Sequence, residues 1–182
     1  MVISARIICG CLFAAFIGGF PGHVRAEQKA EIEVAFTPGD DIPALLVKRI
    51  DAAKKSVKVQ AFLFTDRRIA NALLAARKRG VEVELIGDAA QHEAGKVQHL
   101  KVLQRAGVRV YLNANFASSH NKVIIVDGGE AGATVVTGSY NFTAAAQSKN
   151  AENVVVISGN SAVTGRFVDN FERHRQQSTP WP

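Results

Sequence analysis

The residues best suited to chemistry lie in one stretch, from Ser118 to Asn153. His120 and Lys122 stand two residues apart and are followed by an apolar run that ends at Asp127. A second polar group comes after a glycine-rich gap and comprises Gly138, Ser139, Asn141 and Glu152. The stretch therefore combines a nucleophilic base, a fixed cation, hydroxyl and amide donors, and carboxylates.

Strand periodicity divides these residues between two faces. Side chains alternate along a strand, so His120 and Lys122 share a face, whereas Asp127 falls on the opposite one. We expect Asp127 to be structural and to hold nearby backbone or a buried base. Ser139 and Asn141 also share a face, and a hairpin between the two strands would bring a histidine, a lysine, a hydroxyl and an amide together.

The phosphate-binding half of this set is formed by donors. Lys122 supplies a fixed positive charge for phosphate oxygens. Ser139 and Asn141 can donate hydrogen bonds to the same oxygens, and Gly138 lets the backbone approach closely. Preorganised donors of this kind stabilise the charge that develops during phosphoryl transfer.

The catalytic half is centred on His120, which can act as a nucleophile or as a general acid and base. Glu152 could bond one ring nitrogen and leave the other free to attack. A lysine on the same face would repel a divalent cation. We therefore expect phosphoryl transfer without a metal and without a cofactor.

The first 26 residues have the pattern of a secretory signal peptide. Arg6 precedes an apolar run from Ile7 to Phe20, and Val24 to Ala26 offer a small-residue cleavage site. An uncleaved membrane anchor is the alternative, although the run is short for a spanning helix. Cleavage would place the mature chain, residues 27–182, in the periplasm or outside the cell.

Cleavage would also change the composition. Both cysteines, Cys9 and Cys11, would leave, which excludes a disulfide, a thiolate nucleophile and a cysteine-ligated zinc site. Loss of Arg6 and Arg25 reduces the 22 basic residues to 20 against 16 acidic ones, and 20 − 16 gives a net charge of +4. A modest positive charge suits a polyanionic partner.

The mature chain alternates strands with helices and reads as one catalytic domain. Predicted strands cover residues 32–36, 57–64, 81–86, 108–112, 123–127, 134–139 and 153–158, and predicted helices cover residues 41–55, 67–79, 92–106 and 162–176. This order predicts a single α/β/α sandwich with a mixed, largely parallel sheet. Active sites in such folds gather at strand ends, where Gln60 and Asp88 could also line the cleft. His92 and His99 are expected on the solvated surface of their helix.

The constellation resembles a known family signature. His120-x-Lys122-x4-Asp127, followed by Gly138-Ser139-x-Asn141 and an acid at Glu152, resembles the HKD motif of the phospholipase D superfamily. The closer resemblance is to its single-motif branch, the secreted bacterial Nuc-type endonucleases. It extends upstream to residues 60–66 and 80–83 and covers nearly all of the mature chain. The ten residues between Asp127 and Gly138 make a longer gap than many members have.

The resemblance implies a role for each matching position. His120 would attack phosphorus and form a phosphohistidine, and the same histidine of a second motif would protonate the leaving oxygen. Lys122 and Asn141 would bind phosphoryl oxygens, Ser139 would assist, and Glu152 would orient His120. A single motif then implies a homodimer with its active site across the two-fold axis.

Three functions follow from these observations. The first is a nonspecific endonuclease that hydrolyses DNA, with RNA left open as a further substrate, and it is favoured by the small size, the basic charge and the nuclease resemblance. The second is a phospholipase D that hydrolyses phosphatidyl lipids. The third is a non-catalytic module that binds nucleic acid or an anionic membrane, against which the complete set of reactive residues argues.

Overall fold

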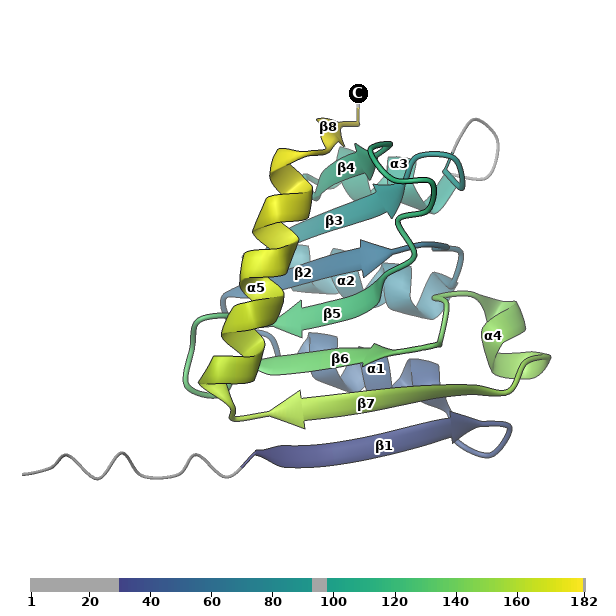
Figure 1. Ribbon diagram of the computed structural model, residues 1–182, viewed down its shortest axis with the longest axis vertical. Helices are drawn as coiled ribbons and strands as arrows, with labels where there is room; N and C mark the ends of the chain where they lie inside the picture. Colours follow the sequence, from purple (N-terminus) through teal and green to yellow (C-terminus); the bar gives the residue numbers. More distant parts are fainter. Residues whose placement is uncertain (1–29, 93–97, 182) are drawn as a thin grey trace, which may run out of the picture.

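The computed structural model describes residues 30–92 and 98–181, and it forms one sheet between two helical layers (Figure 1). The predicted signal peptide, residues 1–26, lies outside the described residues. The eight strands run in the order β1-β7-β6-β5-β2-β3-β4-β8. Their bounds are β1 Glu31–Thr37, β2 Ser56–Ala61, β3 Glu82–Asp88, β4 Arg109–Asn113, β5 Lys122–Val126, β6 Thr134–Gly138, β7 Glu152–Ser158 and β8 Thr179–Pro180.

The sheet is mixed, as expected, but its parallel part is smaller than the sequence suggested. Within residues 30–92 and 98–181, the β2–β3 and β3–β4 ladders are the only parallel ones. The five other ladders are antiparallel, including the whole run from β2 through β5, β6 and β7 to β1. The expectation of a largely parallel sheet is therefore wrong for strand pairing. The physical reason is that the connections β5–β6 and β6–β7 contain no long crossover helix, so β5, β6 and β7 pair as an antiparallel meander that joins the rest of the sheet through the antiparallel β5–β2 ladder.

The described helices are α1 Ile42–Asp51, α2 Arg67–Lys78, α3 Gln98–Arg105, α4 Ala144–Ser148 and α5 Ser161–Gln176. Helices α1, α2 and α3 lie on one face of the sheet, and the long helix α5 crosses the other (Figure 1). Asp41 caps α1 and Asp66 caps α2, each through a side-chain oxygen that accepts backbone amides of the first turn. None of the helices in the described residues is long and apolar enough to cross a membrane.

Alternating strand residues bury two separate apolar layers. On the α1–α3 side, Val57, Val59 and Leu85 belong to the larger core. On the α5 side, Ile125 and Val135 pack with Phe171 of α5 in a smaller core. Strands with apolar residues on both faces fill the middle of the sheet, as in other sheets covered on both sides.

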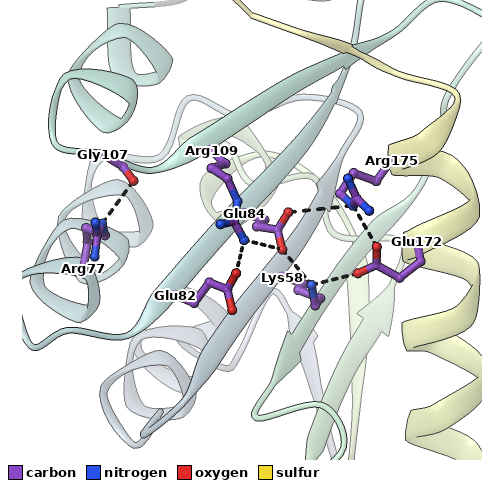
Figure 2. Close-up of polar contacts among 8 residues, drawn as sticks. All are labelled: Lys58, Arg77, Glu82, Glu84, Gly107, Arg109, Glu172 and Arg175. Atoms are coloured by element: carbon purple, nitrogen blue, oxygen red, sulfur yellow. Dashed lines mark hydrogen bonds and ion pairs between the residues drawn. The ribbon is translucent and has the colours of Figure 1, made fainter.

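An ion-pair network fixes α5 to the sheet (Figure 2). Lys58 on β2 donates to Glu84 on β3 at 2.7 Å and to Glu172 on α5 at 2.9 Å. Arg175 pairs with Glu172 at 2.7 Å, and Arg109 on β4 reaches Glu84 at 3.0 Å. Burial opposes the charge of Lys58, but the two carboxylates outweigh it and raise its pKa. Arg109 also pairs with Glu82, so three bases face three acids, and the network is structural and not an anion site.

Two predicted boundaries differ because tertiary contacts intervene. The first helix ends at Asp51 instead of residue 55, and the amides of Lys54 and Lys55 bind the carboxylate of Asp127. Strand β2 ends at Ala61 instead of residue 64, and beyond it the Phe62 amide donates to Asn121 O at 2.9 Å. Helix α4 and strand β8 were not predicted.

Candidate active site

The predicted reactive residues meet at one edge of the sheet. His120 directly precedes β5 and Lys122 opens it, while Gly138 closes β6 and Ser139 follows it. Glu152 opens β7. The antiparallel registers place Val123 opposite Thr137 and Gly138 opposite Val154, so these strand ends lie side by side. The hairpin pairing that the sequence predicts is therefore confirmed.

His120 and Lys122 lie against the same aromatic ring. The His120 ring is exposed and packs on Phe62, with 4.4 Å between ring centroids and an interplanar angle of 56°. The Nζ of Lys122 lies 4.9 Å from the centre of the same ring and donates to His120 O at 2.9 Å. Phe62 thus contacts both the exposed imidazole and the buried lysine, a role that no local sequence pattern indicates.

The Lys122 side chain is buried and lies near the carboxylate of Glu152. The residue is only 6% exposed. Burial lowers its pKa below the ordinary value, and the nearby Glu152 carboxylate offsets part of that effect. A buried cation without a full anionic partner is well suited to binding an incoming phosphate group.

Ser139 and Glu152 form a hydrogen-bonded cluster beside Lys122. Ser139 Oγ donates to one oxygen of Glu152 at 2.5 Å, and Asn150 Nδ2 donates to the other at 2.8 Å. The Asn153 amide donates to Ser139 Oγ at 3.1 Å. The hydrogen bonds of the described residues include none between Glu152 and the His120 ring, so the orienting role of Glu152 stays a prediction.

Asn141 carries an unpaired polar atom at this edge. Its Oδ1 is buried and has no hydrogen-bond partner among the described residues. Unpaired buried polar atoms are uncommon in native proteins and occur at functional sites. The unpaired atom is an acceptor and cannot bind a phosphoryl oxygen, so the predicted role of Asn141 as a phosphate donor stays a prediction.

Gly138 is required for close strand packing. A β-carbon at this position would lie 2.2 Å from the carbonyl oxygen of Asn153 on β7. The next residue, Ser139, donates its amide to that same carbonyl at 3.1 Å. The glycine therefore sets the distance between β6 and β7 at the point where Ser139 and Glu152 meet.

Asp127 lies at the far end of β5 from His120. Its carboxylate accepts the backbone amides of Lys54, Lys55 and Ser56 at 2.7–3.1 Å. Its own φ is 50°, a left-handed conformation that aspartate tolerates better than most residues. These contacts join the α1–β2 turn to the end of β5 and place the carboxylate away from the reactive edge.

The contacts of Asp127 predict a pH-dependent stability. Burial alone would raise its pKa, but the bonds from the Ser56, Lys55 and Lys54 amides hold the pKa below its ordinary value. Its stabilising contribution is thus complete above the unfolded pKa of about 3.9 and is lost as the pH falls through the lower folded value. We expect Asp127→Ala to lower the free energy of unfolding by about 1–3 kcal/mol at pH 7, because three backbone amides lose their acceptor.

The measurement is urea unfolding between pH 7 and pH 3. Asp127→Asn keeps an acceptor and tolerates the left-handed φ, so it should lose less stability than the alanine variant and show a flatter acid limb. Equal stability of wild type and Asp127→Ala at pH 7 would contradict this account.

The structure also places Asp88 and His92, two residues whose positions are predicted from the sequence. Asp88, proposed to line the cleft, is buried and bonds to backbone next to His120. His92 is also buried and not on a solvated surface, with Nδ1 2.8 Å from Asp88 O, and burial lowers its pKa. The signal for Asp88 was its place at the end of a predicted strand. No sequence signal marked the burial of His92, which follows the turn after β3 and is not helical, although the third helix was predicted to begin there.

Comparisons with known proteins agree with this arrangement. A family model described as "Cardiolipin synthase, PLD-like domain" matches residues 46–175. The chain is 38% identical over 135 residues to a protein named phospholipase D from Rickettsia bellii (strain RML369-C), which covers 74% of this chain and 65% of that protein. It is 28% identical over 160 residues to the human (Homo sapiens) mitochondrial cardiolipin hydrolase, covering 88% of this chain and 61% of the hydrolase. The chain thus spans less than two thirds of the length of both relatives.

A solved structure matches over a larger share of its length. The crystal structure of Nuc, a phospholipase D family member from Salmonella typhimurium, has a TM-score of 0.79 and 33% sequence identity. The alignment covers 84% of this chain and 99% of that one.

Proposed function

Since the chain belongs to the phospholipase D superfamily, we propose that it is a metal-independent phosphodiesterase that works through a phosphohistidine on His120. The observation that carries this proposal is the strand-end cluster itself. An exposed imidazole lies beside a buried lysine, and both contact one aromatic ring. Hydroxyl and amide donors follow on the neighbouring strand, which is the donor set that a phosphoryl group requires.

The proposed reaction proceeds in two balanced steps. A ring nitrogen of His120 attacks phosphorus, the bond from phosphorus to the leaving oxygen breaks, and the partner subunit's His120 gives that oxygen a proton. In the second step the partner's His120 takes a proton from water, and the water oxygen displaces the histidine nitrogen from phosphorus. Lys122, Ser139 and Asn141 hold the phosphoryl oxygens in both steps. Glu152 orients His120, and Asp127 has a structural role.

An uncovered apolar surface supports the homodimer that this mechanism needs. Ile32, Val34 and Phe36 on the edge strand β1 are 64%, 54% and 55% exposed. Ile32 lies opposite Ile157 of β7, which lies opposite Val135 of the α5-side core, so this surface is on the α5 side of the sheet. Helix α5 crosses one end of the sheet, and no helix in the described residues covers the rest of β7 and β1 there (Figure 1).

This surface, which we call the β1 face, is continuous with the reactive edge. Phe36 lies opposite Asn153, whose amide donates to Ser139 Oγ. A second copy packed on the β1 face would therefore lie next to the Ser139–Glu152 cluster. A two-fold arrangement buries the same patch on both copies, which would cover these apolar side chains and bring two reactive edges together.

The β1 face gives a direct prediction for assembly. Val34→Glu places a charge at its centre, so we expect the dimer to dissociate and the activity to fall with it. Sedimentation velocity and hydrolysis of a phosphodiester measure the two effects. Val102→Glu is the matched control, because Val102 is also apolar and 45% exposed but lies on α3, and it should leave both unchanged.

Two outcomes would contradict the prediction. A Val34→Glu protein that stays dimeric and active would remove the β1 face from the interface. A folded, fully active monomer would refute the shared site.

Among substrates we propose DNA, and also RNA, as the phosphodiester that is cut. The resemblance to the Nuc-type branch supports this choice, as does the net charge of +4 expected for the mature chain. A nonspecific nuclease needs contacts only with backbone phosphates. The alternative is hydrolysis of phosphatidyl lipids, which the names of the relatives from Rickettsia bellii and humans favour. We propose a periplasmic or secreted location, after removal of residues 1–26.

One assay separates these activities. Purified mature protein is incubated with plasmid DNA, with RNA, and with vesicles of phosphatidylcholine or cardiolipin, each in excess EDTA beside a His120→Ala variant. Nucleic-acid cleavage by the wild type alone supports the nuclease, and lipid headgroup release alone supports the phospholipase. Loss of activity in EDTA would refute the metal-independent mechanism. Binding without turnover would support a non-catalytic module.

A further inference from the structure

Asp88 connects the end of β3 to the residue that precedes His120. The side chain is buried, with the residue only 3% exposed. Its Oδ2 accepts the Ser119 amide at 2.7 Å, and its Oδ1 accepts the Gln91 amide at 3.0 Å. Ser119 itself is 6% exposed. A carboxylate that accepts a backbone amide in a buried setting forms a strong and directional hydrogen bond.

The segment around His120 is held at successive residues. Ser119 is bound by Asp88, and the carbonyl of His120 accepts from Lys122 Nζ. The carbonyl of Asn121 accepts the Phe62 amide at 2.9 Å, and the ring of Phe62 packs on the imidazole. The parallel register of β2 and β3 pairs Ala61 with Gly87, so the next residues, Phe62 and Asp88, extend side by side on one face. Contacts from Phe62, just after β2, and from Asp88, at the end of β3, thus fix the main chain on both sides of His120.

The segment before Ser119 has few structural restraints of its own. Residues 114–118 are exposed and belong to neither a helix nor a strand. The Asp88 bond lies between this exposed stretch and His120. Without it, the main chain on the N-terminal side of His120 would be free to shift, while the Phe62 and Lys122 contacts on the other side would remain.

We propose that Asp88 is a positioning residue for His120, acting through the Ser119 amide to keep the imidazole in line with phosphorus. Asp88 does not touch the substrate in this scheme. The inference rests on the proposed nucleophilic role of His120 and adds to it the group that fixes its main chain. Misplacement of a reacting group by about 1 Å can cost on the order of 100-fold in rate.

The test compares two buried carboxylates that do similar structural work. Asp66 is buried as well, and its Oδ1 accepts the Arg68 and Ile69 amides at the start of α2. Its side chain makes no hydrogen bond to residues 119–122 in the part of the chain that the structure describes. We expect Asp88→Ala to lower kcat by roughly 100-fold, with KM changed by less than about threefold, because substrate binding is left intact. Asp66→Ala should lose stability but keep kcat.

Asparagine variants keep the test valid if the alanine protein folds poorly. Asp88→Asn retains one acceptor oxygen and should recover part of kcat, to within about tenfold of the wild type. Thermal unfolding confirms folding, and single-turnover kinetics separate phosphohistidine formation from binding. Full kcat in folded Asp88→Asn and Asp88→Ala, or an equal fall of kcat in the Asp66 variants, would overturn the proposal. If His120→Ala stayed active, the proposed function would fail first, and independently of Asp88.

Discussion

Replacing His120 with alanine should reduce phosphodiester hydrolysis by on the order of 10⁴-fold or more, the scale seen when a covalent nucleophile is removed from a hydrolase. The exposed ring makes no hydrogen bond among the described residues, and its only described ring contact is Phe62. The substitution should therefore leave the fold and the free energy of unfolding nearly unchanged. Initial rates and urea unfolding on the same preparations measure both effects. His99→Ala on α3 is the matched control and should keep full activity.

A mixture of subunits makes this prediction more specific. If each site needs His120 from both copies, a heterodimer of wild type and His120→Ala is inactive. Random reassembly of equal amounts should then give about a quarter of the wild-type activity, because only that share of dimers carries two histidines. Half of the wild-type activity would show that each subunit works alone.

Replacing Gly138 with alanine should cause the largest loss of stability of any single methyl addition at the reactive edge. The new β-carbon would lie 2.2 Å from Asn153 O and 2.9 Å from Val154 Cα, and both atoms belong to the backbone of β7. Backbone in the middle of a ladder cannot move aside as a flexible side chain can. We expect a loss of at least about 1–3 kcal/mol, the usual cost of overpacking. Activity should fall too, because any shift of β7 separates Ser139 from Glu152.

Gly165→Ala provides the matched control for Gly138→Ala. Gly165 lies inside α5, and a β-carbon there would meet no atom within 4 Å. Alanine is the better helix former by up to about 1 kcal/mol, so this variant should be slightly more stable than the wild type. Urea unfolding midpoints compare the two. A Gly138→Ala protein as stable as Gly165→Ala would show that β6 and β7 tolerate a wider spacing than the structure has.

The sequence predicted the elements of this fold well wherever local signals were complete. Polar residues that favour helix caps stand before both predicted helices, as Asp40 and Asp41 before α1 and as Thr65 and Asp66 before α2, and the structure shows that Asp41 and Asp66 are the caps. Two strand-like runs, residues 123–127 and 134–139, on either side of a glycine-rich loop predicted the β5–β6 hairpin, which has the expected pairing. Strand direction was harder to predict, since the residue pattern of a buried strand is the same whether its neighbours run parallel or antiparallel.

The parts of the site that escaped prediction depend on contacts between distant segments. The stacking of Phe62 on His120 joins residues 58 positions apart, and no local pattern in either segment specifies it. Asp88 was identified as a strand-end residue, but its bond to Ser119 follows from the path of the β4–β5 connection. Glu152 was expected to bond His120, whereas its oxygens accept from Ser139 and Asn150. A short polar side chain near several donors has more than one partner available, and the sequence cannot rank them.

The most direct measurement of the central claim is to trap the covalent intermediate. An oligonucleotide with radiolabelled internal phosphates is mixed with the enzyme in excess EDTA, and the reaction is quenched within the first turnover under alkaline denaturing conditions that preserve phosphohistidine. We predict label on the peptide that contains His120, stable to alkali and released by acid. Turnover in EDTA with no label on any histidine, or label on a residue other than His120, would contradict the account.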